Sequence, residues 1–355
     1  MKKLKIAIIG TGEIANVCHL PGYRSIPEEC EVVALCDTQP EVLAQASRRW
    51  EISRTTTYFR DLVDDPEIDA VSVTTPNRFH LDPTVAFLRA GKHVLCEKPL
   101  AMNAAEARQM VQAARESGKI LQVALQMRFG SSGRFMRQFI DSGGMGEIYY
   151  ARAHALRRRG VPHWGVFTNK ELQGGGPLID IGVHILDLTL YLMGYPKPVV
   201  ASAGCWDLLA KNPKLTNFWG PYDPTKFTVE DFAVGFIRFE NGACVTLESS
   251  FMANMEGDPF QTQLFGTRAG AIVKNSGDDP VRIFTEVEGQ FFNMTPPHLP
   301  KVESAHTAEV QAFIRAIHNG DPSPVPGEHG WILNAIFDAM YASAESGREV
   351  AVQLD

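Results

Sequence analysis

Four polar side chains interrupt the otherwise apolar stretch GGGPLIDIGVHILDLTLYLMG, residues 174–194. Their spacing of i, i+4, i+7 and i+11 puts them on one face of a helix: Asp180, His184, Asp187 and Tyr191. Pro177 and Gly194 stand where such a helix, residues 177–193, would begin and end. A buried carboxylate or imidazole is costly unless it is paired. The stripe is therefore either a hydrogen-bond ladder between helices or an acid/base site near the helix start.

The segment GTGEIA follows the apolar run KLKIAII and fits G-x-G-x-x-A with Gly10, Gly12 and Ala15. Between a strand and a helix, this pattern favours dinucleotide binding, because the glycines allow a tight turn and a close approach to pyrophosphate. Asp37 ends the next predicted strand, at about the spacing of a carboxylate that accepts from the adenosine ribose hydroxyls. No arginine follows it directly, so NAD is favoured over NADP. Capping of the next helix is the plainer role for Asp37.

Two further predicted strands end in polar residues, Thr74–Asn77 and the pair Glu97 and Lys98. Ligands of doubly wound sheets lie beyond the carboxyl ends of the strands. Lys98 is thus predicted to face the cofactor, the alternative being an idle surface lysine. The predicted cofactor contacts are Gly10, Thr11, Gly12, Glu13, Ile14, Asp37, Thr75, Pro76, Asn77, His80, Glu97 and Lys98.

A basic and aromatic stretch, residues 154–164, precedes the triple glycine. Such a run is usually a solvated edge, but arginine forks can also donate to vicinal hydroxyls while a tryptophan packs against a sugar ring. The long aromatic loop 206–227 is predicted to form a wall or lid of the pocket. The predicted substrate contacts are Arg128, Arg157, Trp164, Asp180 and His184.

In order, GTGEIA, TTPNRFH, CEKPL and GGGPLIDIGVHILD resemble the Gfo/Idh/MocA family of NAD(P)-dependent oxidoreductases, and the likeness extends to the tail GEHGWILNAIFDAMYASAESGREV. The resemblance implies that Lys98 lies beside the nicotinamide and that Asp180 and His184 lie against the substrate. It also implies a homodimer or homotetramer built on a free sheet face. AHALRRRGVPHWGVF and NFWGPYDPTKFTVED resemble members that oxidise a ring hydroxyl of glycosides, typically at C3.

The chemistry that these residues suit is hydride transfer between a secondary alcohol and the nicotinamide. His184 would act as the base, Lys98 would stabilise the developing alkoxide, and Asp180 would orient His184 or hold a neighbouring hydroxyl. The expected substrate is a carbohydrate or cyclic polyol. Three alternatives stay open: an inositol-type dehydrogenase, a glycosidase that recycles a retained NAD, and a non-catalytic dinucleotide- or sugar-binding regulator.

The elements that must position these residues divide the chain in two. Alternating strands and helices over residues 1–125 predict a Rossmann domain with a doubly wound parallel sheet. Residues 126–355 carry longer strands, and the resemblance implies a C-terminal α/β domain, with an open, mostly antiparallel sheet, for substrate binding and oligomerisation. Glu240-Asn241-Gly242 predicts a hairpin between two of these strands.

Composition excludes several other classes of function. The chain of 355 residues is 45% hydrophobic and 21% charged, as expected of a globular protein. Its net charge of −7 argues against nucleic acid or a membrane surface as partner. The apolar run before Gly10 is shorter than a signal-peptide core. Six scattered cysteines predict neither disulfides nor a metal site, and the cytoplasm is the expected compartment.

Overall fold

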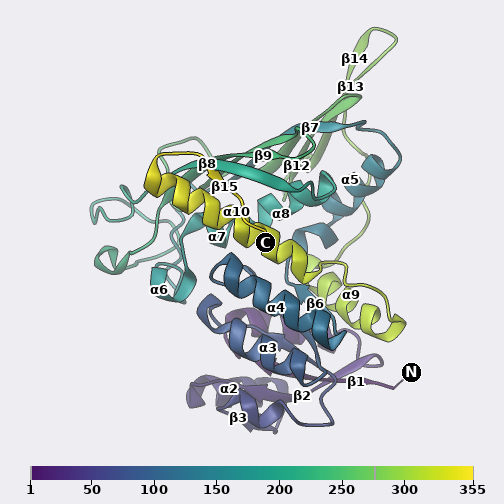
Figure 1. Cartoon of the computed structure of the whole chain (residues 1–355), viewed down its shortest axis with the longest axis vertical. Coiled ribbons are helices and arrows are strands. Elements are labelled where there is room, and N and C mark those ends of the chain that lie inside the picture. Colours follow the sequence, from purple (N-terminus) through teal and green to yellow (C-terminus); the bar gives the residue numbers. More distant parts are fainter. Residues whose placement is uncertain (1, 276, 355) are drawn as a thin grey trace. The chain divides into compact units, whose positions relative to one another are not determined.

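The computed structural model describes residues 2–275 and 277–354 (Figure 1). Contacts divide the chain into two compact units, one of residues up to 126 together with 303–334, the other of residues 127–302 and 335–355. The sequence predicts one domain boundary, between residues 125 and 126, which assigns residues 303–334 to the second domain. Instead, helix α9 (Ala305–Asn319) of that segment packs in the first unit, because its apolar face completes the first core with Val310, Phe313 and Ile314.

The first unit contains a six-stranded parallel sheet in the order β3-β2-β1-β4-β5-β6. Its strands are β1 (Leu4–Ile9), β2 (Cys30–Cys36), β3 (Thr55–Thr56), β4 (Ala70–Val73), β5 (His93–Cys96) and β6 (Leu121–Val123). The chain winds outward from β1 in one direction and from β4 in the other. The topological switch point, where such sheets bind ligands, therefore lies at the carboxyl ends of β1 and β4. The predicted Rossmann topology is confirmed.

Helices alternate with the strands of the first unit over residues 1–125, as predicted, with one local difference. Two more helices come from the segment 303–334. The helices of the unit are α1 (Leu20–Arg24), α2 (Pro40–Trp50), α3 (Leu81–Arg89), α4 (Ala104–Ser117), α9 and the first part of α10 (Gly327–Ser346). The glycine turn leads first into a π-helical turn, Ala15–His19, which α1 continues. Such π turns are rare and often accompany functional sites. The Pro-rich connector 321–328 also pairs with the sheet, because Val123 N–H donates to the carbonyl of Val325 at 3.0 Å.

The second unit is built on a nine-stranded, mostly antiparallel sheet in the order β14-β13-β12-β11-β7-β10-β9-β8-β15. β7 and β10 form its parallel pair. The strands are β7 (Ile148–Leu156), β8 (Pro198–Trp206), β9 (Phe232–Phe239), β10 (Cys244–Ser250), β11 (Phe260–Gly266), β12 (Ala269–Lys274), β13 (Val281–Val287), β14 (Gln290–Met294) and β15 (Val350–Ala351). The 240–242 turn joins β9 and β10 as predicted. The segments FQTQLFGTRAGAIV and VRIFTEVEGQFF form the hairpins β11/β12 and β13/β14.

One face of this sheet packs on α8 (Gly182–Leu192), through β7, β10 and β11. The remaining helices of the unit are α5 (Ser131–Asp141), α6 (Lys170–Gln173), α7 (Pro177–Asp180) and the end of α10. Helix α8 is apolar and almost wholly buried, as the sequence indicates. Among the described residues no single helix is long and apolar enough to cross a membrane; one bent pair, residues 170–180 with 182–192, passes by length and composition alone.

The predicted helix 177–193 is broken at Ile181, where φ is −108° and α7 gives way to α8. The carbonyl of Pro177 accepts from the backbone N–H of Ile181 at 3.1 Å and also from the Ser249 hydroxyl at 2.6 Å. The Pro177 carbonyl thus accepts two hydrogen bonds next to the break, one within the helix and one from β10. Asp180 therefore ends the short helix α7, whereas His184 stands in the first turn of α8.

Candidate active site

The turn after β1 is shaped for a pyrophosphate. Gly10 has a φ of +93°, and a Cβ at this position would lie 2.8 Å from the backbone carbon and oxygen of Thr74. A Cβ on Gly12 would meet no atom within 4 Å, so the space beside this residue is open. The Asn16 amide, which the sequence analysis missed, fixes the turn by donating to the carbonyls of Thr11 at 2.7 Å and Gly12 at 2.8 Å. These residues fit a dinucleotide phosphate.

Asp37 lies beyond the end of β2 and is tied to the glycine turn. Its Oδ2 accepts from the backbone N–H of Thr11 at 2.7 Å and from the Thr11 hydroxyl at 3.1 Å, and its Oδ1 accepts from the N–H of Gln39 at 2.9 Å. A carboxylate has about four acceptor positions, which leaves capacity for a ribose hydroxyl. Its negative charge would repel a 2′-phosphate, in agreement with the predicted preference for NAD. Of the other predicted contacts in this region, Glu13 is exposed and Ile14 is half-buried.

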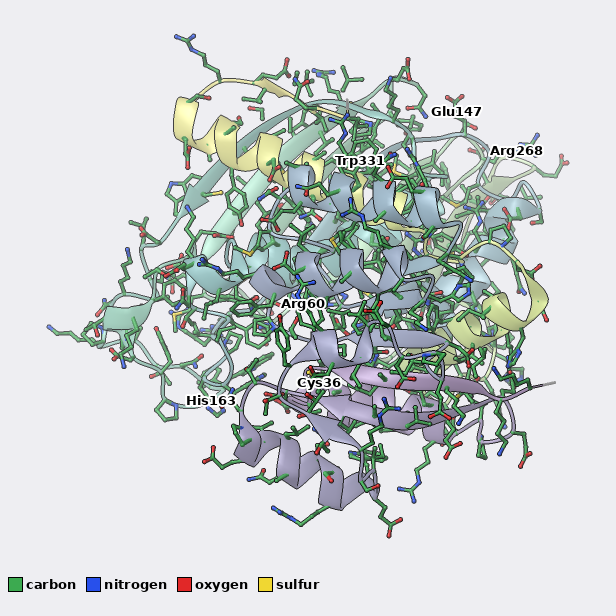
Figure 2. All side chains as sticks on the ribbon, turned by 60° about the horizontal axis from the view of Figure 1, so that its bottom comes forward. Cys36, Arg60, Glu147, His163, Arg268 and Trp331 are labelled. Atoms are coloured by element: carbon green, nitrogen blue, oxygen red, sulfur yellow. The ribbon has the colours of Figure 1, made fainter. Side chains whose placement is uncertain are left out.

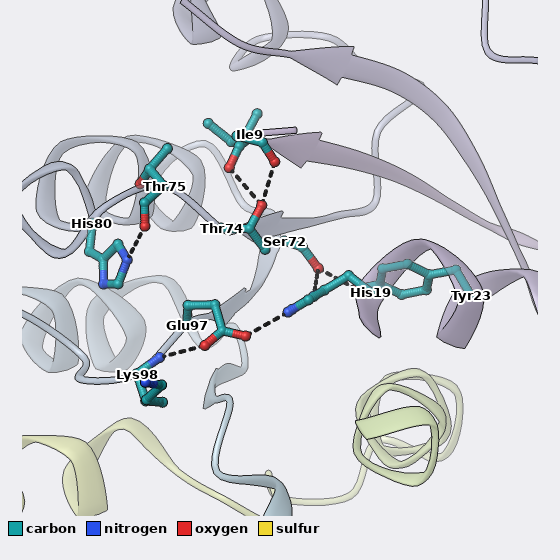
Figure 3. Close-up of polar contacts among 10 residues, drawn as sticks. Ile9, His19, Tyr23, Ser72, Thr74, Thr75, His80, Glu97 and Lys98 are labelled. Atoms are coloured by element: carbon teal, nitrogen blue, oxygen red, sulfur yellow. Dashed lines mark hydrogen bonds and ion pairs between the residues drawn. The ribbon is translucent and has the colours of Figure 1, made fainter. Parts of the chain in front are cut away.

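The loops after β4 and β5 are braced by His80. The ring is fully buried; Nδ1 lies 3.0 Å from the carbonyl of Pro99, and Nε2 lies 2.8 Å from the carbonyl of Thr75 (Figure 3). Burial lowers the pKa of His80, although the three neighbouring carbonyls and Glu97 act in the opposite direction. The sequence predicts that His80 contacts the cofactor, but this placement favours a role in holding the loops. Asn77 is buried beside it, whereas Pro76 is exposed.

Glu97 and Lys98 follow β5 directly. The Glu97 side chain is buried, with Oε1 lying 2.9 Å from Nε2 of His19 and Oε2 accepting from the backbone N–H of Lys98 at 3.1 Å (Figure 3). Lys98 itself is half-buried. The first unit thus presents a fixed carboxylate and an ammonium group at the same strand end.

In the second unit, Glu230 holds the start of α7. Its Oε2 accepts from the N–H of Gly176 at 2.9 Å, and its Oε1 accepts from the N–H of Leu178 at 3.1 Å and from the Tyr341 hydroxyl at 2.9 Å. Burial raises the pKa of Glu230. A Cβ on Gly175 would overlap Tyr341, and one on Gly176 would overlap the Glu230 backbone. The triple glycine therefore permits this close packing, a reason that the sequence analysis missed.

The polar stripe serves two purposes along its length. Asp180 is 9% exposed at the end of α7, and His184 is half-buried one turn later. Asp187, fully buried, lies instead in an ion pair with Arg128, whose Nε donates to Asp187 Oδ2 at 2.9 Å and whose Nη2 bonds Oδ1. The Tyr195 hydroxyl closes the group by donating to Asp187 Oδ1 at 2.5 Å. Asp180 and His184 therefore remain a candidate acid/base site, whereas Asp187 belongs to a structural hydrogen-bond network.

The structure therefore argues against the predicted substrate contact of Arg128. Its side chain is 4% exposed, and its guanidinium bonds both Asp187 and Tyr195. Burial alone would lower the pKa of Arg128, but the charge and hydrogen bond of Asp187 act together with Tyr195 and Tyr191, and the pKa is raised above its ordinary value. Arg128 is fixed as a structural cation. Its partner lies 59 residues away in the sequence, so local pattern gave no sign of the pairing.

The side chains of Arg157 and Trp164 both pack against the ring of Trp219. The guanidinium carbon of Arg157 lies 3.9 Å from the centre of the Trp219 ring, and the Trp164 ring stacks on Trp219 at 5.6 Å with an angle of 9° between planes. His163, labelled in Figure 2, lies edge-on to Trp164 at 5.1 Å. The charge of Asp180 acts on Arg157 and raises its pKa, although burial is the larger effect and the net pKa is lowered. The Arg157 guanidinium, which lies over the Trp219 ring, is thus near enough to Asp180 to be affected by its charge.

The loop 206–227, which contains Trp219, is fastened to the segment that carries Trp164. Asn217 makes this link by accepting from the backbone N–H of Val161 at 2.9 Å and donating to the carbonyl of Val161 at 2.8 Å. Trp164 and Trp219 remain 39% and 38% exposed, respectively. This geometry supports the predicted wall of a pocket, and Trp219 joins the candidate residues.

Comparisons with known proteins agree with this geometry. The model described as "Oxidoreductase family, NAD-binding Rossmann fold" matches residues 4–125, and that described as "Oxidoreductase family, C-terminal alpha/beta domain" matches residues 137–352. The chain is 37% identical over 355 residues to D-glucoside 3-dehydrogenase of Escherichia coli (strain K12), covering 98% of this chain and 97% of the relative. It is 33% identical over 354 residues to 1,5-anhydro-D-fructose reductase of Ensifer adhaerens, covering 98% of each.

The fold also aligns with solved structures. Levoglucosan dehydrogenase in complex with NADH and L-sorbose superposes with a TM-score of 0.87 at 25% identity, over 99% of this chain and 100% of that one. Two family models together span most of the sequence, and two relatives above 30% identity span nearly all of it. The chain belongs to the Gfo/Idh/MocA family and is an NAD-dependent oxidoreductase.

Proposed function

We propose that this enzyme oxidises a secondary ring hydroxyl of a glycoside, at C3, to give a 3-keto sugar. The observation that carries the proposal is the group formed by Arg157, Trp219 and Trp164 near Asp180, a surface suited to a polar ring with apolar faces. The relative named D-glucoside 3-dehydrogenase, which matches over nearly the whole chain, supports the choice of substrate class and carbon.

The proposed catalytic residues are His184, Asp180 and Lys98. When bound, NAD⁺ supplies the carbon that accepts the hydride. His184 takes the proton of the reacting hydroxyl as the C–H hydride leaves and the C=O bond forms. Asp180 orients His184 or holds the neighbouring hydroxyl. Lys98 offers a positive charge to the oxygen as it becomes an alkoxide. In the reverse direction His184 returns the proton.

Arg157 is proposed to hold the sugar hydroxyls. Within residues 2–275 and 277–354 its guanidinium donates one hydrogen bond, from Nη1 to the carbonyl of Gly160 at 3.1 Å, so its other N–H groups can bind a substrate. Arg157→Lys keeps the charge but loses the planar fork. We expect kcat/KM for the sugar to fall about 10- to 100-fold while the Kd for NAD⁺ stays unchanged. Arg158→Lys, at an exposed neighbour, is the matched control; an equal loss in both variants would contradict the assignment.

The substrate proposal is tested by mixing the protein and NAD⁺ with glycosides, free sugars and inositols. NADH absorbance and keto products are followed in the same samples. Net NADH with a 3-keto glycoside is the expected result, whereas preference for inositols would favour the related dehydrogenase activity. Product without net NADH would indicate a recycled cofactor. No reaction with any compound would favour a binding regulator.

We also propose a cytoplasmic homodimer or homotetramer. The sheet face opposite α8 carries half-buried aromatic side chains from three strands, including Phe236 of β9 and the pair Tyr150 and Phe265, whose rings lie 5.2 Å apart. A sheet face that carries clustered aromatic side chains commonly marks an interface. Sedimentation velocity should give two or four times the monomer mass, and Phe236→Glu should lower it to that of the monomer. A monomeric wild type would refute the proposal.

A further inference from the structure

A buried chain of polar side chains runs behind Lys98 in the first unit (Figure 3). The Tyr23 hydroxyl lies 2.6 Å from Oγ of Ser72, which lies 3.0 Å from Nδ1 of His19. Nε2 of His19 lies 2.9 Å from Oε1 of Glu97, and the other Glu97 oxygen accepts from the backbone of Lys98. None of Tyr23, Ser72, His19 or Glu97 is more than 7% exposed. No step of the proposed hydride transfer uses the first three.

The donors and acceptors of this chain have a consistent direction. Burial raises the pKa of Tyr23, so its hydroxyl stays protonated beside Ser72. A carboxylate can only accept, so Nε2 of His19 donates in its bond to Glu97. Both Glu97 oxygens therefore accept from N–H groups, an arrangement that stabilises the carboxylate. Burial alone would raise the pKa of Glu97, but His19 and Lys98 outweigh burial, and the pKa is lowered.

This carboxylate lies in the half of the sheet that serves the nicotinamide. Each half of a doubly wound sheet binds one mononucleotide. Asp37, after β2, fits the adenosine ribose, so the nicotinamide half falls to the strand ends of β4 and β5, where Thr74 and Glu97 lie. The oxidised nicotinamide ring carries a positive charge that the reduced ring lacks. A fixed negative charge here favours the oxidised form, whereas Lys98 favours the reduced one.

We propose that His19 is a positioning residue, which holds Glu97 as a carboxylate beside Lys98. Through this carboxylate, His19 and Glu97 together raise the affinity for NAD⁺ relative to NADH. Besides Lys98, four titratable groups act electrostatically within the same region: Cys18, His80 before α3, and His306 and Glu309 of α9. The proposal depends on NAD binding alone, so it stands or falls independently of which sugar is oxidised.

The test measures the dissociation constants of NAD⁺ and NADH by calorimetry, without substrate, in the full-length protein. Glu97→Gln should raise the ratio Kd(NAD⁺)/Kd(NADH) about tenfold at pH 7. His19→Leu should raise it in the same direction, and more strongly as the pH is lowered, because Glu97 without its donor has a higher pKa and becomes neutral on acidification. His19→Gln, which retains an N–H donor, should keep the ratio within about twofold of the wild type.

The double variant tests whether His19 and Glu97 affect the Kd ratio as a coupled pair or independently of each other. His19→Leu with Glu97→Gln should show the ratio of Glu97→Gln alone, because His19 acts through Glu97. His93→Leu, at the start of the strand that ends before Glu97, is the control and should leave the ratio unchanged. The proposal is overturned if Glu97→Gln leaves the ratio unchanged, or if His19→Leu weakens both nucleotides equally, since that result indicates a structural role only.

Discussion

His184→Ala is expected to lower kcat by about 10²- to 10⁴-fold, the usual contribution of a positioned general base. The imidazole is half-buried in the first turn of α8, one turn beyond Asp180. Its removal leaves the alcohol proton without an acceptor as the hydride departs. Because the cofactor contacts are assigned to the first unit, the Kd for NAD⁺ should not change. Stopped-flow measurement of NADH formation, together with calorimetric titration of NAD⁺, checks both parts.

Two controls make this result specific. His154→Ala removes a half-buried histidine of β7 that lies 3.5 Å from Glu248, and it should leave kcat near that of the wild type. The pH profile gives the second control, because loss of the base should remove the acidic limb of kcat. Equal losses of kcat, nucleotide affinity and thermal stability in His184→Ala would show that the residue is structural.

Asp187→Ala, one turn further along the same helix, is expected to act on stability instead. It would leave the guanidinium of Arg128 buried without its counter-ion, and breaking such a pair costs about 3–5 kcal/mol. Urea denaturation should show this loss in the free energy of unfolding. Any fraction that remains folded should turn over at close to the normal rate, because neither residue is assigned to the chemistry.

The matched control replaces both members of the pair. Arg128→Met with Asp187→Leu removes the two charges together, and well-packed apolar residues in place of a buried ion pair are often neutral or stabilising. The double variant should therefore be more stable than Asp187→Ala by several kcal/mol. If the stable double variant instead lost its affinity for the sugar, Arg128 would be a substrate residue as the sequence predicts, and the structural assignment would be wrong.

Only part of the fold and of the candidate site could be predicted from the sequence. The first unit was predictable because its signals are local. Every strand except β6 is followed by a polar residue or glycine, and the turn at Gly10 and Gly12 has a steric requirement visible in the residue types. The same holds for the 240–242 hairpin. Hairpins whose turns lack this signature, such as Thr267-Arg268 between β11 and β12, resemble one continuous strand in the sequence.

Partners distant in the sequence could not be predicted in the same way. His19 meets Glu97 across 78 residues, and Glu230 meets Gly176 across 54. Buried polar groups satisfy one another through the fold, and residue types alone do not say which donor reaches which acceptor. The polar stripe shows the limit most directly. Spacing predicted four residues on one face of a single helix, but the helix breaks at Ile181, and spacing could not show that Arg128 would bind Asp187.

The packing of α9 in the first core also bears on how the enzyme is made. The α9 residues Val310, Phe313 and Ile314 share a core with Ile8, Leu20 and Tyr23. The first set is translated almost three hundred residues after the second. At about 5–20 residues per second, the ribosome delivers these partners roughly 15–60 s after the first strand has emerged. During that interval the nascent nucleotide unit exposes apolar surface, a state that chaperones recognise. A chain released early, before α9, would carry the whole glycine turn and still lack the helix that completes its core.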